Sequence, residues 1–286
     1  MYEHLRNSGY YVEVLGSPYT CFDARQYGAL LIVDPEEEYF PEEVKKLAKD
    51  FDLHGLSIIV FADWYNISVM KKVKFYDENT RQWWIPDTGG ANIPALNDLL
   101  KPWNIAFGDK VYEGEFKFGS NHDMFYASGT SIVQFPEKNS VLIKRDLNDQ
   151  SHEMISGETL KSKDVAILGF YNVKSESNSE PTKGRIAVYG DSNCLDSAHL
   201  QRDCFWMLEA LLQFTSTSVV PNIFQPNCPD CSQPGTVIDE QSSVKKEIIW
   251  FSEAHPPERM EGNNLHRYSK VLQSNLGKFF IRSAFR

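Results

Sequence analysis

Apolar residues in the first third of the chain form short unbroken runs, separated by one segment with helical periodicity. The runs predict strands at 10–15, 29–33 and 56–61, each followed closely by Gly, Pro or Asp, which end strands. Runs without polar alternation are typical of strands covered on both faces, as in parallel sheets. The segment 41–51 places apolar residues on one helical face and predicts a helix, and 92–100 predicts a second, shorter one.

The middle of the chain changes to shorter strand-like pieces between Gly, Pro, Asn and Ser residues. The predicted pieces are 125–127, 131–135, 141–143, 165–170 and 185–189. Apolar residues then keep helical spacing from Leu200 to Leu212, which predicts a long helix. We predict an α/β part over 1–110, a β-rich part over 111–215 that either joins it in one domain or stands apart, and a Pro/Ser-rich linker or tail over 216–286.

Composition and charge exclude several classes of protein. Hydrophobic residues make up 42% of the 286, enough for a sizeable core, so a wholly disordered chain is excluded. Acidic residues number 39 against 29 basic ones, and the net charge of -10 argues against a nucleic-acid or anionic-membrane binder. No apolar run approaches the roughly 20 residues of a membrane span, and residues 1–6 lack the apolar core of a signal peptide.

Three short motifs match those around subtilase catalytic residues, but in the wrong order. They are Asp87-Thr88-Gly89, His54-Gly55 and Gly129-Thr130-Ser131. A subtilase runs Asp, His, Ser along the chain, whereas His54 precedes Asp87. Using His122 instead leaves too short a segment before Ser131, which itself lies in a predicted strand rather than at a helix start. We therefore predict no catalytic triad, and the single Asp-Thr-Gly triplet excludes an aspartic protease dyad.

A second set of motifs resembles the blocks of GDSL-type esterases. Gly190-Asp191-Ser192 is followed four residues later by the block from Asp196 to His199, whereas those enzymes separate the two blocks by most of a domain. The favoured interpretation is a strand end and a helix cap. A small serine hydrolase using Ser192 or Ser131 is kept as an alternative.

The five cysteines are too few for a disulfide scaffold. Cys194 and Cys204 are close enough to bridge across a strand-to-helix corner, and buried free thiols are the equal alternative. Cys228 and Cys231 have zinc-ligand spacing, but only His255 and His266 lie near, so we predict no metal site and no cofactor.

One N-glycosylation sequon, Asn66-Ile67-Ser68, matters only in a secretory lumen. The pairs Trp64-Tyr65 and Trp83-Trp84 fit either a core or an aromatic groove for a peptide or glycan.

Longer blocks of the chain resemble the subtilisin/kexin-type, membrane-anchored serine endopeptidases. The blocks are 1–6, 12–16, 36–43, 72–99, 112–116, 189–196, 203–206 and 258–263, of which 72–99 is the most specific. The resemblance covers 1–215 and 257–272 and is to the luminal region downstream of the subtilase domain. The family's catalytic Asp, His and Ser lie upstream of that region, so none is carried over to this chain. We expect the chain to be a fragment or an incomplete gene product.

The resemblance implies a role in the lumen of the endoplasmic reticulum and Golgi. It also implies that the whole protein cleaves membrane-bound transcription factor precursors such as sterol regulatory element-binding proteins. This chain is then expected to be a non-catalytic luminal domain whose partners are the subtilase domain of the same protein, membrane-anchored substrates and luminal accessory proteins. A free-standing binding module is the main alternative, and whether the chain is itself an enzyme stays open.

The α/β half also resembles non-catalytic glutamine-amidotransferase-like domains. The resemblance rests on the turn from Gly90 to Asn92 into a helix and on the late strand that ends at Gly190. It implies an α/β, flavodoxin-like fold with a mainly parallel sheet, a β-rich second half and a disordered C-terminal tail. Active amidotransferases place a Cys nucleophile at the turn after a central strand. In this chain the turn, residues 61–64, has the sequence Phe-Ala-Asp-Trp and contains no Cys, which implies a scaffold without that activity.

Overall fold

The computed structural model describes residues 1–119, 122–172, 183–196, 202–224 and 254–260, and the backbone of two short strands further on. The helices are α1 (Tyr2–Asn7), α2 (Pro41–His54), α3 (Ile67–Lys72), α4 (Ile93–Leu100), α5 (Gln150–Ser156) and α6 (Phe205–Thr217). The strands are β1 (Ala29–Val33), β2 (Ser57–Phe61), β3 (Phe75–Asp77), β4 (Gln82–Trp84), β5 (Ala106–Phe107), β6 (Tyr112–Phe118), β7 (His122–Gly129), β8 (Ile132–Gln134), β9 (Ser140–Asp149), β10 (Leu160–Tyr171), β11 (Ile186–Tyr189), β12 (Leu272–Gln273) and β13 (Phe280–Ile281).

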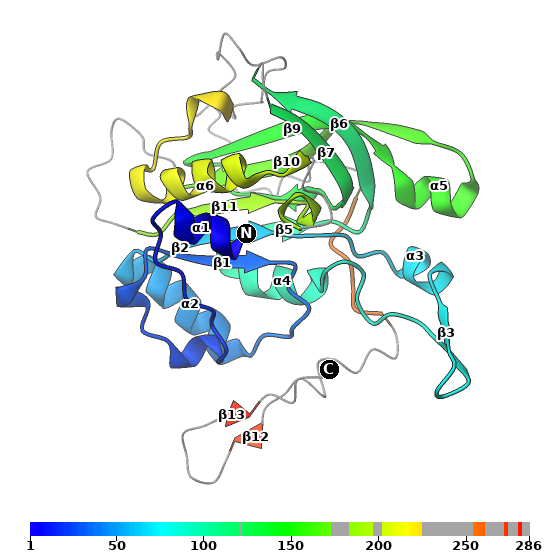
Figure 1. The fold of residues 1–286 in the computed structure, drawn as a ribbon, viewed down its shortest axis with the longest axis horizontal. Coiled ribbons are helices and arrows are strands. Elements are labelled where there is room, and N and C mark those ends of the chain that lie inside the picture. Colours follow the sequence, from blue (N-terminus) through cyan, green and yellow to red (C-terminus); the bar gives the residue numbers. More distant parts are fainter. Residues whose placement is uncertain are drawn as a thin grey trace.

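A seven-stranded sheet with the order β1-β2-β11-β10-β9-β6-β7 forms the centre of the molecule (Figure 1). β1, β2 and β11 are parallel, whereas every further pair from β11 to β7 is antiparallel. The prediction of a mainly parallel sheet is therefore wrong. In the second half of the chain, β6 turns directly into β7 and β9 leads through α5 into β10, and strands that neighbour each other after such a reversal of the chain pair antiparallel. Because strands from 1–110 and 111–215 share this sheet, the two predicted parts form one structural unit.

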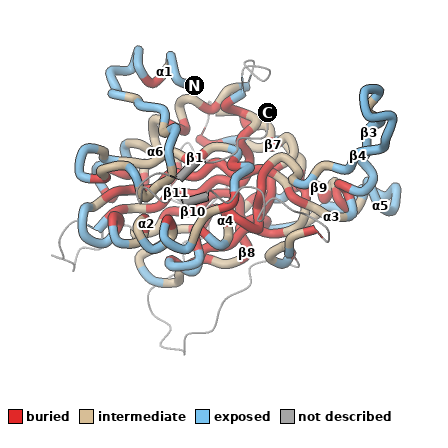
Figure 2. Tube along the Cα trace, turned by 90° about the horizontal axis from the view of Figure 1, so that it is seen from below, coloured by how far each residue is buried: buried red, intermediate tan, exposed pale blue. Residues whose placement is uncertain are grey.

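Helices cover both faces of the parallel strands. In β2, Ile58 and Val60 point to the face covered by α2 and α4, whereas Ile59 and Phe61 point to the face covered by α6 and α1. All four side chains are fully buried. This explains why the strand is an unbroken apolar run, as the sequence predicts for a strand between two helical layers. Figure 2 shows the buried strands at the centre of the molecule.

The predicted helices at 41–51 and 92–100 correspond to α2 and α4. α2 begins at Pro41, and Gly55 ends it in the left-handed conformation with a φ of 69°. The predicted strand at 10–15 is wrong, because this segment pairs with no strand and leaves Tyr11 and Val14 exposed by 84% and 79%. Its aromatic and β-branched composition suits a strand, but a segment becomes a strand only when it pairs with a neighbouring strand, and composition does not show whether one is available.

The prediction that 216–286 is a linker or tail is wrong for two stretches. α6 continues to Thr217, and Phe224 beyond it is buried in the core. Residues 254–260, which we call the C-terminal strap, return to the domain and bury Ala254 and Met260. Pro-rich composition does not reveal such anchoring, because single apolar and charged side chains provide it. The rest of the predicted tail lies outside the described residues, apart from the short β12–β13 pair.

In the described part of the chain, no helix combines the length and apolar character needed to cross a membrane.

Candidate functional site

Three aspartates gather where the parallel strands end. Asp34 directly follows β1, Asp63 follows β2 by two residues, and Asp191 follows β11 by two residues. Carboxyl ends of parallel strands meet at one edge of a sheet, the usual position of ligand sites in α/β folds. Asp191 is fully buried and Asp63 is 6% exposed, whereas Asp34 is exposed. This edge is therefore the first place to look for chemistry.

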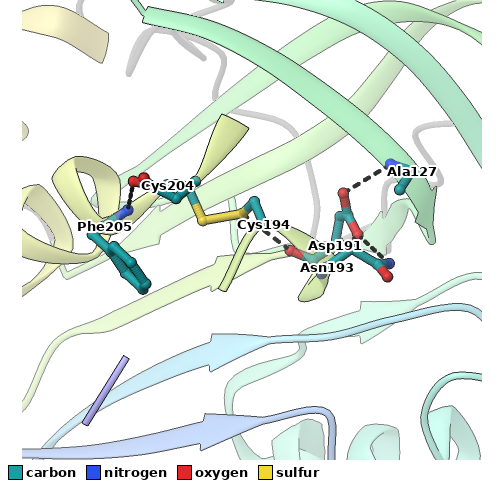
Figure 3. The surroundings of a disulfide bond; sticks show 7 residues. Ala127, Asp191, Asn193, Cys194, Cys204 and Phe205 are labelled. Atoms are coloured by element: carbon teal, nitrogen blue, oxygen red, sulfur yellow. Dashed lines mark hydrogen bonds between the residues drawn. A yellow bond between two sulfur atoms is a disulfide. The ribbon is translucent and has the colours of Figure 1, made fainter. Parts of the chain in front are cut away.

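A polar network connects Asp63 with Asp191. Asn193 donates its side-chain N–H groups to Oδ2 of Asp63 at 3.3 Å, to Oδ1 of Asp191 at 2.8 Å and to Oγ of Ser128 at 3.0 Å. Ser128 and Ser192 donate hydroxyls to Asp63 at 3.3 and 3.5 Å, and the Trp64 amide donates to it at 2.7 Å. Asp191 also accepts the Ala127 amide at 3.0 Å, which ties β7 to the end of β11 (Figure 3). The two carboxylates thus hold loops together.

Burial, together with the nearby charges of Asp191 and Asp34, raises the pKa of Asp63 to about 8, against the hydrogen bonds from Trp64 and Ser128 that lower it. The pKa of Asp34 is raised to about 6, first by desolvation and then by the charges of Glu36 and Asp196. Asp63 therefore carries a proton at neutral pH. A protonated carboxyl both donates and accepts hydrogen bonds, which suits a position beside a second buried carboxylate.

Substituting Asp63→Asn is expected to remove a pH dependence of stability. The folded state binds this proton more tightly than the unfolded state, so its stabilising contribution is complete below pH 4 and declines as the pH rises toward 8. Between pH 5.5 and 7.0 the parent should lose about 2 kcal/mol relative to Asp63→Asn. Urea denaturation of both proteins at the two pH values measures this difference. Parallel pH profiles for parent and variant would contradict the assignment.

The turn at which active amidotransferases carry their nucleophile is filled here. A Cβ on Gly90 would lie 2.4 Å from Cγ of Asp63, and a Cβ on Gly89 would lie 2.4 Å from the carbonyl oxygen of Trp64. The Gly90 amide donates to that same carbonyl at 2.9 Å. The glycine pair thus packs directly on the corner after β2.

Among the described residues, no three His, Cys, Asp or Glu side chains converge as metal ligands.

The residues of the subtilase-like motifs do not assemble into a triad. His54 ends α2 beside Asp50, at 4.0 Å, and Asp87 lies in the loop after β4. Ser131 is fully buried, and its hydroxyl makes no hydrogen bond in the described structure. The ring of His122 stacks on Trp206, with centroids 4.0 Å apart. A serine whose hydroxyl contacts no base is not an activated nucleophile.

The Gly129 and Gly190 motifs instead pack against each other. The Thr130 amide donates to the Gly190 carbonyl at 2.8 Å, and the Tyr126 hydroxyl donates to the Thr130 carbonyl. A Cβ on Gly190 would lie 2.0 Å from the Tyr126 hydroxyl and 2.2 Å from the Thr130 carbonyl. Close contact between the end of β11 and the turn after β7 therefore explains these glycines. Ser192 bonds to Asp63, and His199 of the esterase-like block lies outside the described residues.

Cys194 and Cys204 form a disulfide in the structure, with Cα atoms 5.3 Å apart (Figure 3). Cys194 belongs to the short helical turn after β11, and Cys204 directly precedes α6. Both cysteines are buried, and the Cys204 amide also donates to the Cys194 carbonyl at 3.2 Å. The bridge fixes the start of α6 beside the Asp191 loop. Cys21, far from this pair in the sequence, is free and exposed.

A tryptic map without reducing agent is expected to show Cys194 and Cys204 in one linked peptide pair. Replacing both with alanine should lower the free energy of unfolding by about 2–3 kcal/mol, because the bridge closes a loop of about ten residues in the unfolded chain. Thermal denaturation of the double variant measures the loss, with Cys21→Ala as the unbridged control. Separate, unlinked peptides would contradict the pairing.

Asn66 has a structural role in addition to its place in a sequon. Its side-chain oxygen accepts the Val69 amide at 2.9 Å and caps α3, and its side-chain nitrogen donates to the Asp109 carbonyl at 2.7 Å. Glycosylation of this residue stays a prediction. Of the cysteine and histidine candidates for zinc, His255 lies in the C-terminal strap, whereas Cys228, Cys231 and His266 lie outside the described residues.

The sequence analysis missed the polar cluster of Asp63, Asp191, Asn193 and Ser128. A signal existed, since an aspartate follows each of three apolar strand runs. Which three strand ends lie side by side depends on the strand order, and the periodicity does not give that order.

Comparison with known proteins matches this chain to a segment of longer proteins that are named as proteases. Residues 1–228 match the family model described as "MBTPS1, fourth GATase-like domain". The chain is 57% identical to human membrane-bound transcription factor site-1 protease over 97% of its own length and 24% of the human protein. It is 42% identical to the subtilisin-like protease SBT6.1 of Arabidopsis thaliana over 96% of the chain and 25% of that protein.

Among solved structures, the mmIFT52 N-terminal domain aligns with a TM-score of 0.49 and 15% identity, covering 76% of this chain and 89% of that one. The chain spans about a quarter of the length of the curated relatives that it matches.

Proposed function

Because this chain belongs to the site-1 protease family, in which it corresponds to the fourth glutamine-amidotransferase-like domain, we propose that it is a non-catalytic domain of a subtilisin-like serine endopeptidase. It folds beside the subtilase domain of the same polypeptide and stabilises it. In this account the catalytic residues belong to that other domain, and this chain contributes binding surface and stability.

One observation carries the proposal. The end of β2, where an active glutamine amidotransferase would hold its cysteine nucleophile, instead contains the buried Asp63, and Gly89 and Gly90 pack directly against this corner. The hydrogen bonds of Asp63 are made to residues of the same domain, including Ser128 of β7 and Asn193 after β11. Groups that satisfy one another in this way stabilise a fold. They leave no activated nucleophile for transfer chemistry.

The substrates and location of the whole enzyme are part of the proposal. The human relative is named for membrane-bound transcription factors, so we propose that the parent protease cleaves such precursors, including sterol regulatory element-binding proteins. It would act in the endoplasmic reticulum and Golgi, where luminal accessory proteins contact it. The disulfide between Cys194 and Cys204 fits an oxidising lumen of this kind.

The experiment is a pair of serine substitutions in the full-length protease. With Ser131→Ala and Ser192→Ala combined, kcat/KM for a peptide substrate should stay within about twofold of the parent, because neither hydroxyl takes part in catalysis. A serine-reactive phosphonate probe should label both proteins equally. A loss of about 100-fold or more in a variant that melts at the parent temperature would overturn the proposal in favour of a serine hydrolase.

A further inference from the structure

The hairpin of β3 and β4 exposes an unusual amount of aromatic surface. Phe75, Tyr76, Trp83 and Trp84 are 57%, 48%, 63% and 46% exposed. Val73 and Ile85, which flank the hairpin, are 45% and 44% exposed. Figure 1 shows the hairpin reaching away from the sheet below α3, and Figure 2 shows it as an exposed projection at one end of the molecule. Exposed apolar patches of this kind mark interaction sites.

Aromatic side chains occupy both faces of this hairpin. Phe75 pairs with Trp84 across the strands, and Tyr76 pairs with Trp83, whose ring centroid lies 5.5 Å from that of Tyr76. Successive residues of a strand point to opposite faces, so each face carries one aromatic pair. A two-stranded hairpin is marginally stable by itself. A groove that contacts both faces would bury both pairs, whereas a flat surface would bury only one.

The same end of the molecule carries further apolar side chains on α5. Met154 and Ile155 are 47% and 51% exposed. Lys72, at the end of α3, donates to the carbonyl oxygens of both residues, which fixes α5 beside α3. We call β3, β4 and these two residues of α5 the aromatic end. Single exposed apolar side chains are common on protein surfaces, but the aromatic end gathers several of them at one end of the molecule.

We propose that the aromatic end docks into a groove on the subtilase domain of the same polypeptide. The inference rests on the proposed function and names the surface through which this domain stabilises the catalytic one. About three quarters of each curated relative lies outside the span that this chain covers, so in those relatives the corresponding segment is covalently attached to neighbouring domains. Covalent attachment makes docking an intramolecular event, so the groove is present at a high effective concentration around the aromatic end. A modest buried area is then enough for stable docking.

Charge indicates the chemistry of the groove. Three lysines, Lys71, Lys72 and Lys74, lie in the segment that leads into the hairpin, whereas the hairpin itself, residues 75–84, carries one basic and two acidic side chains. Lys74 lies 5.2 Å from the centre of the Trp83 ring, so a cation lies beside the aromatic surface at its base. The groove is therefore apolar where it receives the aromatic pairs and acidic where it meets the lysines at the base of the hairpin, which adds specificity to the apolar contact.

A lipid surface fits the hairpin less well. The tip between the strands, residues 78–81, consists of polar and charged side chains, and Asp77 beside it accepts hydrogen bonds from Asn79 and Thr80. Insertion into a bilayer from the tip would bury these groups before the aromatic ones.

A second copy of the chain also fits the hairpin less well than a domain of the same polypeptide. A hairpin that binds in a groove of another copy makes a head-to-tail contact, and such contacts build open filaments unless a ring closes.

The test places a photo-crosslinking amino acid at Phe75 in the full-length, membrane-bound protease. The expected result is a product that migrates as a single chain and whose crosslinked peptide comes from the subtilase domain. Trp84→Ser should abolish this product. The same amino acid at Leu53, which is 67% exposed on α2, is the matched control and should give no crosslink to that domain. A crosslink to lipid, to a second chain or to another domain, or no crosslink, would overturn the inference.

The two proposals fail in different ways. If Ser131→Ala with Ser192→Ala abolishes activity while the Phe75 crosslink forms, the non-catalytic function is wrong and the docking surface stands. If activity survives the serine substitutions but the Phe75 crosslink does not form, the function stands and the assignment of the aromatic end is wrong.

Discussion

Arg259→Ala is expected to lower the free energy of unfolding by about 3 kcal/mol, because it removes the cation of a buried ion pair. Arg259 donates to both oxygens of Glu38, at 2.9 and 2.6 Å, and to Asp98 at 2.8 Å. Glu38 is only 4% exposed, and these bonds raise the pKa of Arg259 above its ordinary value. The Met260 amide, next in the chain, donates to the Tyr65 hydroxyl at 2.9 Å. Loss of the ion pair should therefore release the C-terminal strap.

Thermal and urea denaturation measure this effect, and Arg25→Ala is the control. Arg25 forms a similar pair with Asp23, at 2.8 Å, but the side chains of Arg25 and Asp23 are 70% and 39% exposed. An exposed pair contributes between about 0 and 1 kcal/mol. Equal losses from the two substitutions would show that burial of Glu38 has no energetic consequence, which contradicts the structure.

Gly190→Ala is expected to destabilise the protein by about 3 kcal/mol or more, through overpacking rather than backbone conformation. The added methyl group would meet the Tyr126 hydroxyl at 2.0 Å and the Thr130 carbonyl at 2.2 Å. Tyr126 is fully buried, and Thr130 is itself bonded to the Gly190 carbonyl, so neither neighbour moves freely.

Urea denaturation compares this variant with Gly28→Ala, because a Cβ on Gly28 meets no atom within 4 Å. The control should change stability by no more than about 0.5 kcal/mol. If Gly190→Ala is as mild as the control, then close packing does not explain the motif, and a role of Gly190-Asp191-Ser192 in chemistry must be reconsidered.

The sequence predicts the parallel part of the fold well. β1, β2, α2 and α4 follow from local periodicity, since each buries a continuous stripe or run. The predicted strand pieces at 125–127, 141–143 and 165–170 lie within β7, β9 and β10, but their antiparallel pairing was not predicted, because it depends on contacts between residues far apart in the chain. The C-terminal strap was missed for a similar reason. Arg259 and Glu38 are separated by more than 200 residues, and neither residue shows in the sequence that it is paired.

The candidate site divides in the same way. Aspartates after strand runs are visible in the sequence, and the absence of a Cys at the turn before Trp64 indicates a scaffold. The raised pKa of Asp63 is not visible there, because it arises from burial and from Asp191, which the topology brings beside it. The structural reason for the glycines of the three-residue motifs is not visible in the sequence either, since Gly129 and Gly190 are required by the close contact between the turn after β7 and the end of β11.

The central claim is that this domain supports a catalytic unit without taking part in its chemistry. The most direct measurement is the temperature dependence of peptidase activity in the full-length protease, with Arg259→Ala compared against Arg25→Ala. The account predicts that Arg259→Ala leaves kcat/KM unchanged at low temperature and lowers the temperature of inactivation together with the melting temperature of this domain. An unchanged inactivation temperature, in a variant whose domain melts early, would contradict the account.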